Sequence, residues 1–168
     1  MMPVVLLSTI ILSMTAILQG TWFGSFSIFG AAPDLPMLVL MWISFHNAKS
    51  EGPVAGFLSG LVEDIISSSP FGFHAFSRTL VAWVVSAFHG SFHIDVIVMP
   101  VLFGIAGTIL KTLTAYALSL LLGDGIFVLS PADAAFWIQC GLNGILAPAI
   151  FFFLTKMRRY LVTQDRKR

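Results

Sequence analysis

Two adjacent acids, Glu63 and Asp64, lie inside an apolar stretch that reads G-P-V-A-G-F-L-S-G-L-V-E-D-I-I. An ionised side chain at membrane depth costs about 3 kcal/mol even on the milder insertion scales, so such residues normally face a bundle interior. Intramembrane acids can relay protons or cations, or they can pair with a basic side chain and hold helices together. The chain offers Arg78 and Lys111 as bases for such a pair. The segment around the two acids is therefore where we expect function.

The composition indicates a polytopic membrane protein. Of the 168 residues, 57% are hydrophobic and 10% are charged, and the mean hydropathy is +0.93; soluble domains have about 25% charged residues. Apolar segments lie at about 3–19, 35–47, 53–68, 75–90, 97–122 and 131–155. We predict an all-α integral membrane protein, with a bundle of about six transmembrane helices over 1–155 and a basic cytoplasmic tail over 156–168. Because the second and fourth segments are short, five spans remain the alternative.

The basic residues predict the orientation. Six of the nine Lys and Arg lie in the tail, and an excess of these residues beside a span marks the cytoplasmic side. Counting back six spans places the N-terminus on the cytoplasmic side as well. The apolar segment from Pro3 to Leu18 has no basic residues before it and no cleavage pattern after it, so we interpret it as a retained first span.

Glycines explain how the acids can be accommodated. Gly52, Gly56 and Gly60 recur every four residues, so they share one face of a helix. Asp64 continues this series, and Glu63 lies on nearly the same face. Small-residue faces allow a neighbouring helix to approach closely. We therefore expect the acids to point into a contact between helices and away from lipid.

The fifth apolar segment carries a similar arrangement with a base. Gly104, Gly107 and Lys111 are spaced i, i+3 and i+7, which places the lysine on a small-residue face. An unpaired buried charge costs far more than a paired one, so we hypothesise that Lys111 or Arg78 neutralises one of the two acids inside the bundle. The alternative is that Lys111 extends its ammonium group to a membrane interface.

Proline and glycine predict where the helices around the acids begin and end. In P-D-L-P, Asp34 is flanked by prolines, and this pattern predicts the start of the second helix with the aspartate as N-cap. Pro70 stops the third helix, and Gly72 permits a turn before His74 opens the fourth.

Two stretches of the chain together resemble a known family. P-D-L-P-M-L-V-L, followed by G-P-V-A-G-F-L-S-G-L-V-E-D-I-I-S-S-S-P-F-G-F-H-A-F, is similar to the pattern of the rod shape-determining protein MreD family over about residues 33–90. The resemblance implies a non-catalytic scaffold in the bacterial inner membrane, part of the cell-elongation (rod) complex, which binds MreC and helps control cell shape and peptidoglycan synthesis. It also implies contacts, direct or through MreC, with MreB, RodA and a class B penicillin-binding protein.

The resemblance further implies a fold similar to the substrate-binding subunits of energy-coupling-factor vitamin transporters. Such a subunit is the alternative function, because fold similarity alone does not carry function. A stand-alone secondary transporter is less favoured, since the chain is short and shows no internal repeat. Membrane lipid is an expected partner of the basic tail, whereas no cofactor and no nucleic acid are expected.

The residues that match the family pattern are expected to shape the bundle and its docking surface. They are Pro33, Asp34, Gly56, Gly60, Glu63, Asp64, Pro70, Gly72 and His74. Arg78 and Lys111 are the possible intramembrane charge partners. The single helix of MreC is expected to dock beside the glycine faces.

Signals for catalysis or metal binding are weak. His89 and His93 are spaced i, i+4 with Asp95 nearby, but the glycine and serine between them indicate a loop, and zinc usually needs at least three ligands. Asp124 follows Leu-Gly as in intramembrane aspartyl proteases, without an obvious second intramembrane aspartate. The single cysteine, Cys140, excludes an intrachain disulfide. We expect no enzyme activity and no metal site.

Overall fold

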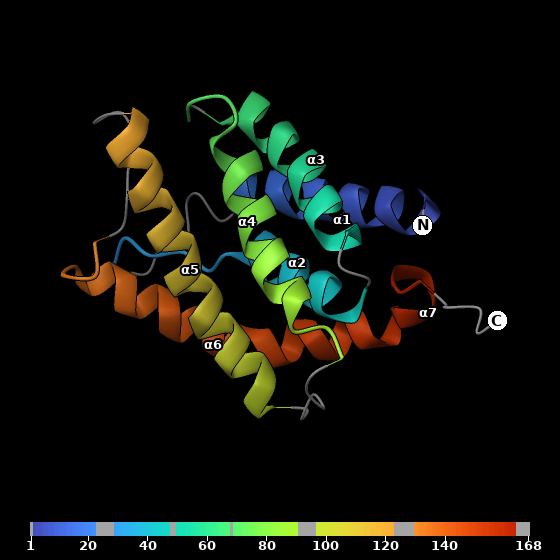
Figure 1. The fold of residues 1–168 in the computed structure, drawn as a ribbon. Coiled ribbons are helices and arrows are strands. Elements are labelled where there is room, and N and C mark those ends of the chain that lie inside the picture. The colour runs from blue at the N-terminus through green and yellow to red at the C-terminus, as the bar shows by residue number, and fades with distance from the viewer. Residues whose placement is uncertain are drawn as a thin grey trace.

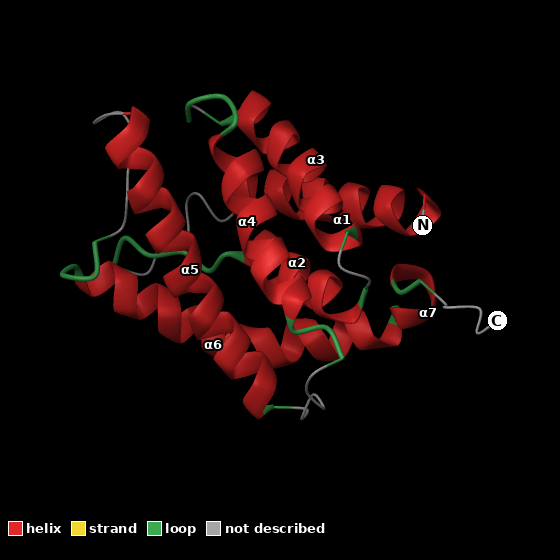
Figure 2. Cartoon of the chain, viewed as in Figure 1, coloured by secondary structure: helices red, strands yellow, loops and turns green. Residues whose placement is uncertain are grey.

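The computed structural model describes residues 2–22, 29–47, 50–67, 69–90, 97–122 and 130–163, and its regular elements are helices (Figures 1 and 2). In chain order they are α1 (Met2–Trp22), α2 (Leu35–His46), α3 (Glu51–Ile66), α4 (Phe73–Ala87), α5 (Val98–Leu122), α6 (Ala134–Lys156) and α7 (Arg158–Leu161). The predicted all-helical class is therefore correct for the described residues.

The six predicted apolar segments coincide with α1 to α6, but the helices differ in length. Three of them are long and apolar enough to cross a membrane, over Pro3–Thr21, Val98–Leu121 and Ala134–Lys156. The helices α2, α3 and α4 have 12, 16 and 15 residues, which gives lengths of about 18 to 24 Å. The hydrocarbon core is about 30 Å thick. Six complete spans are therefore not confirmed, and α7 is a helix that the sequence did not predict.

Helix α2 forms the centre of the bundle. Residues Pro36 to Phe45 are all buried, and α2 contacts α1, α3, α4, α5 and α6. A helix that is apolar on every side is typical of such a buried position. Trp42, the largest of its side chains, is completely shielded. Because protein surrounds α2, its length does not have to match the thickness of a bilayer.

The predicted glycine face packs against the protein's own helices. A Cβ atom added at Gly60 would collide with the backbone of Ala75 in α4, and one at Gly56 would lie 3.1 Å from the carbonyl oxygen of Arg78. At Gly52 the added atom would collide with Ser44 of α2. The glycines thus bring α3 against α4 and α2, as their spacing predicted. The glycine face of α3 is therefore occupied by the protein's own helices.

The chain after α6 folds back onto the start of α3. The Asn47 side chain donates to the Leu161 carbonyl (2.8 Å) and accepts from the Thr163 amide (2.9 Å). The Thr163 hydroxyl donates to Glu51 Oε1 at 2.6 Å. Helix α7 also contacts α1, and Figure 1 shows the start of α1 and α7 at the same end of the molecule. The first residues of the predicted tail therefore pack against the bundle.

Replacing Gly60 with alanine should destabilise the protein, because the new methyl group would meet the Ala75 backbone and push α3 away from α4. Overpacking of this kind costs about 1 to 3 kcal/mol. Thermal unfolding in detergent would measure the loss. Gly141→Ala is the matched control, since an added Cβ there has no neighbour within 4 Å. Equal melting temperatures for the two variants would contradict the close α3–α4 contact.

Candidate functional site

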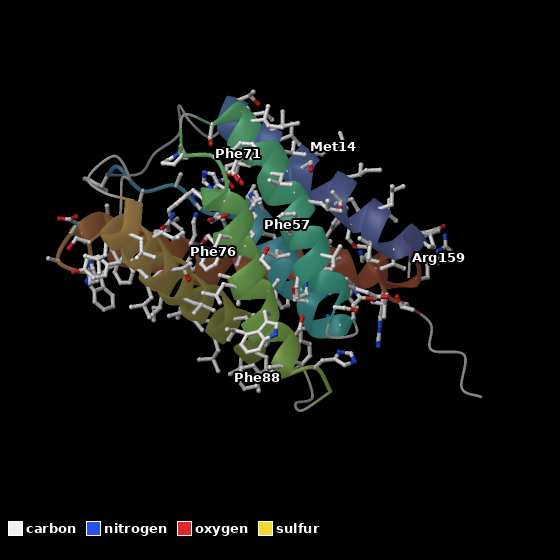
Figure 3. All side chains as sticks on the ribbon, turned by 45° about the horizontal axis from the view of Figure 1, so that its top comes forward. Met14, Phe57, Phe71, Phe76, Phe88 and Arg159 are labelled. Carbon is white, nitrogen blue, oxygen red and sulfur yellow. The ribbon has the colours of Figure 1, made fainter. Side chains whose placement is uncertain are left out.

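The predicted site residues gather where α2 begins, α3 ends and α4 begins, beside the middle of α5. In Figure 3 this end of the molecule is marked by Phe71, just before α4, and by Phe76 in its first turn. We call the side chains of Asp34, Glu63, Asp64, His74, Arg78 and Lys111 in this region the charge network.

Asp34 has two roles in the charge network. Its Oδ1 accepts the amide proton of Met37 at 3.1 Å, so Asp34 caps α2, as the P-D-L-P pattern predicted. Pro33, directly before it, is buried. Its other oxygen, Oδ2, forms an ion pair with the ammonium group of Lys111. Only 7% of the aspartate side chain is exposed, against 36% for the lysine. The lysine therefore pairs with an acid that the charge hypothesis did not include.

Glu63 pairs with Arg78, one of the combinations that the sequence suggested. The guanidinium group lies against Glu63 Oε2, and its Nη1 donates to the Ser59 hydroxyl at 3.3 Å. The ring of His74 lies beside the same acid, with Nδ1 3.8 Å from Glu63 Oε1, and its Nε2 is 3.2 Å from the Ser69 hydroxyl. The pair joins the last turn of α3 to the first turns of α4.

Asp64 has no basic partner among the described residues and instead caps α4. Its two oxygens accept the backbone amide protons of Gly72, His74 and Ala75 at 2.9, 2.8 and 3.2 Å. The N-cap position of α4 is Gly72, whose φ of 93° suits glycine and which has no side chain to accept these protons. A carboxylate at a helix N-terminus is also favoured by the helix dipole. Asp64, near the end of α3, therefore provides the hydrogen-bond acceptors for the first turn of α4.

Three uncharged polar side chains extend the network, and the sequence analysis did not single them out. The Asp34 amide donates to Asn143 Oδ1, and Asn143 Nδ2 donates to the Thr108 hydroxyl, both at 2.8 Å. Gln19 Oε1 accepts the Leu35 amide proton at 2.8 Å. The signal was present, because an asparagine or glutamine inside an apolar span usually bonds across helices.

The charge network encloses little space. Asp34, Glu63, His74, Arg78 and Lys111 line a cavity of about 20 Å³, which is room for about one water molecule. Two of these residues are acids that pair with two bases, Glu63 with Arg78 and Asp34 with Lys111. The arrangement is suited to holding four helices together and has no room for an organic substrate.

The candidate metal and protease residues lie mostly outside the described part of the chain. This is so for His93, Asp95 and Asp124. The ring Nδ1 of His89 lies 2.6 Å from the Phe45 carbonyl oxygen and donates to it. Among the described residues, no group of three or more His, Cys, Asp or Glu side chains could hold a metal ion.

A double-mutant cycle should reveal the coupling between Asp34 and Lys111. Lys111→Met leaves the buried aspartate without its counter-ion, and we expect a loss of about 2 to 3 kcal/mol in unfolding free energy, reduced from the value for fully buried pairs by the partial exposure of the lysine. Asp34→Asn keeps a capping side chain. The double variant should lose less than the sum of the two single variants. Strict additivity in thermal unfolding would show that the pair contributes nothing.

Two substitutions at Asp64 should separate capping from charge. Asp64→Ala leaves three amide groups of α4 without their acceptor and should cost about 2 kcal/mol or more. Asp64→Asn retains one carbonyl oxygen and should lose clearly less. Hydrogen exchange at the first turn of α4 would report the local effect. Equal protection of that turn in the wild type and the alanine variant would contradict the capping role.

A comparison with known protein families confirms the resemblance seen in the sequence. The profile of one protein family, described as rod shape-determining protein MreD, matches residues 2–157. No curated protein and no solved structure matches the chain, so the expected similarity to vitamin-transporter subunits stays a prediction. Because the match covers most of the 168 residues and includes the whole charge network, the chain belongs to the rod shape-determining protein MreD family.

Proposed function

We propose that this protein is a non-catalytic scaffold of the cell-elongation complex in the bacterial inner membrane, where it binds MreC and helps control peptidoglycan synthesis. The family match supports a role in rod-shape determination. The observation that carries the scaffold role is that the acids of the charge network are used to join helices. Asp34 pairs with Lys111, Glu63 pairs with Arg78, and Asp64 caps α4.

The exposed side of α1 is the surface that we assign to the MreC helix. The glycine faces of α3 and α5 are filled by α2, α4 and α6. Of the three long helices α1 is the least buried: 17% of its apolar span is buried, against 39% for α5 and 33% for α6. Leu6, Ile10 and Met14 are exposed and follow each other every four residues, so they form one stripe. Figure 3 shows Met14 on the outer side of α1.

The orientation proposed for this scaffold has both termini in the cytoplasm. The start of α1 and helix α7 lie at one end of the bundle, and most basic residues of the chain follow α6. A basic excess marks the cytoplasmic side of a span. In this orientation the charge network lies toward the outer leaflet. MreB is then reached from the cytoplasmic end, and RodA and the class B penicillin-binding protein are reached within the membrane, directly or through MreC.

The mechanism proposed is stabilisation of one conformation of the partner. A scaffold can shift its partner only by the difference between its affinities for the partner's two states. A bundle whose helices are joined by buried ion pairs presents a well-defined surface for such discrimination. The alternative, a vitamin-binding transporter subunit, gains no support from the family match, and the cavity in the charge network is far too small for a vitamin.

Purification from the native membrane tests the proposal directly. We expect the tagged protein, extracted at endogenous expression in mild detergent, to bring down a bitopic MreC protein together with the elongation synthases, as identified by mass spectrometry. Recovery of a pair of ATPases with a small-molecule ligand would overturn the scaffold and support the transporter subunit.

The α1 surface is tested by a bulky substitution. Met14→Trp should lower the yield of co-purified MreC about tenfold, which corresponds to about 1.4 kcal/mol, because the indole would hold the partner helix away from α1. The variant should keep its own thermal stability, since Met14 is 57% exposed. Ile145→Trp on the exposed side of α6 is the matched control and should leave the yield unchanged. Equal yields for the two variants would place the MreC contact elsewhere.

A further inference from the structure

A groove lies between α1 and α3, near the ends of both helices. It has a volume of about 440 Å³ and is lined by residues between Ala16 and Thr21 of α1 and by Glu63, Ile66 and Ser67. Sites for small ligands have volumes of about 300 to 1,000 Å³ and combine apolar walls with a few convergent polar groups. The groove has this size and this mixture of residues.

Glu63 is shared between the groove and the small cavity of the charge network. Its Oε2 is buried and faces Arg78. Its Oε1 is 3.8 Å from His74 Nδ1, which is beyond the distance of a hydrogen bond. Within the described part of the chain, this oxygen accepts no hydrogen bond. Glu63 therefore lines the groove and has a carboxylate oxygen that accepts no hydrogen bond from the described residues.

The remaining polar groups of the groove are consistent with a ligand that has a donor at one end. Gln19 uses its oxygen to accept the Leu35 amide proton, which leaves its NH₂ group to donate. None of the described residues that line the groove is a lysine or an arginine. Ile17 and Ile66 supply apolar walls, with 42% and 61% of their surfaces exposed. The complementary ligand carries a positive, proton-donating group joined to an apolar chain.

We propose that this groove binds a phospholipid with a primary ammonium headgroup, of the phosphatidylethanolamine class. The ammonium donates a hydrogen bond to Glu63 Oε1, the Gln19 amide donates to the lipid's phosphate or ester oxygens, and an acyl chain lies along Ile17 and Ile66. The α1 wall, from Ala16 to Thr21, rises about 8 Å. This length suits a headgroup and the start of a chain, whereas a membrane-crossing partner helix needs a contact surface of about 30 Å.

Native mass spectrometry of the delipidated full chain tests the proposal with three dioleoyl lipids that differ only in their headgroups. Phosphatidylethanolamine should be retained about tenfold more than phosphatidylcholine, because a quaternary ammonium cannot donate the charge-assisted hydrogen bond. Phosphatidylglycerol, whose net charge is negative, should be retained no better than phosphatidylcholine. Equal retention of all three, or preference for phosphatidylglycerol, would overturn the proposal without any variant being made.

A matched pair of glycine substitutions then locates the site. Gly20 lines the groove, and an added Cβ there meets no atom within 4 Å, so Gly20→Leu is expected to occupy part of the groove. It should reduce phosphatidylethanolamine retention to the phosphatidylcholine level. Gly141→Leu on α6 has equally open surroundings and should retain the preference. Melting temperatures without added lipid should match the wild type for both. Retained preference in Gly20→Leu would show that the lipid binds elsewhere.

Glu63→Gln tests the acceptor itself. The glutamine keeps the size of the side chain but removes its negative charge, so the tenfold preference for the ammonium headgroup should disappear. An unchanged preference would exclude Glu63 as the acceptor. The proposed scaffold function does not enter this test, because lipid retention is measured without MreC. Failure of the lipid proposal would therefore leave the scaffold proposal untouched, and the reverse also holds.

Discussion

Charged side chains inside this bundle need partners from the protein itself, because the lipid chains around it offer neither counter-charges nor donors. Removing an ion from water costs several kcal/mol, and only close partners compensate. The three acids meet this constraint in different ways. Asp34 joins a helix cap to an ion pair with Lys111, Glu63 pairs with Arg78, and Asp64 receives three backbone amide protons. Asp34 joins α2 to α5, whereas Glu63 and Asp64 both join α3 to α4. The partner that each acid needs therefore constrains how these four helices are arranged.

The central helix α2 shows how far such polar contacts determine the arrangement. Helix α2 is too short for a bilayer to define its position, but its two ends are held by the C-terminal third of the chain. At its start the Asp34 amide donates to Asn143 of α6. At its end Asn47 bonds to the backbone of Leu161 and Thr163. Most of the rest of α2 is apolar, so these polar ends, together with the bond from the Ser86 hydroxyl to the Ser44 carbonyl, define its position along the bundle axis.

The features that could be predicted from the sequence are those encoded by short spacings. The four-residue glycine repeat predicted the close face of α3, and P-D-L-P predicted the capped start of α2, because both depend on residues within one or two turns. The partner of Lys111 could not be predicted in this way. Asp34 lies 77 residues away, and the choice between it and the acids of α3 depends on how α5 crosses the bundle.

The role of Asp64 was missed for a different physical reason. A search for opposite charges finds counter-ions but overlooks backbone amides, which occur at every helix start and leave no mark in the sequence. Gly72 was a partial signal, because a glycine N-cap has no side-chain oxygen and requires an acceptor from elsewhere. The number of complete spans could not be predicted either, because hydropathy identifies apolar segments but does not show which of them are enclosed by other helices.

The position of Glu63 relates the charge network to the surrounding membrane. The oxygen that faces Arg78 is buried, and Glu63 is also one of the residues that line the groove between α1 and α3. A donor that enters the groove can therefore bond to the carboxylate without displacing the arginine. An anionic group would act differently, because it would repel the acid and compete for the guanidinium group. With the proposed lipid bound, a positive donor in the groove would add to the interactions that join α3 and α4, whereas an anion would weaken them.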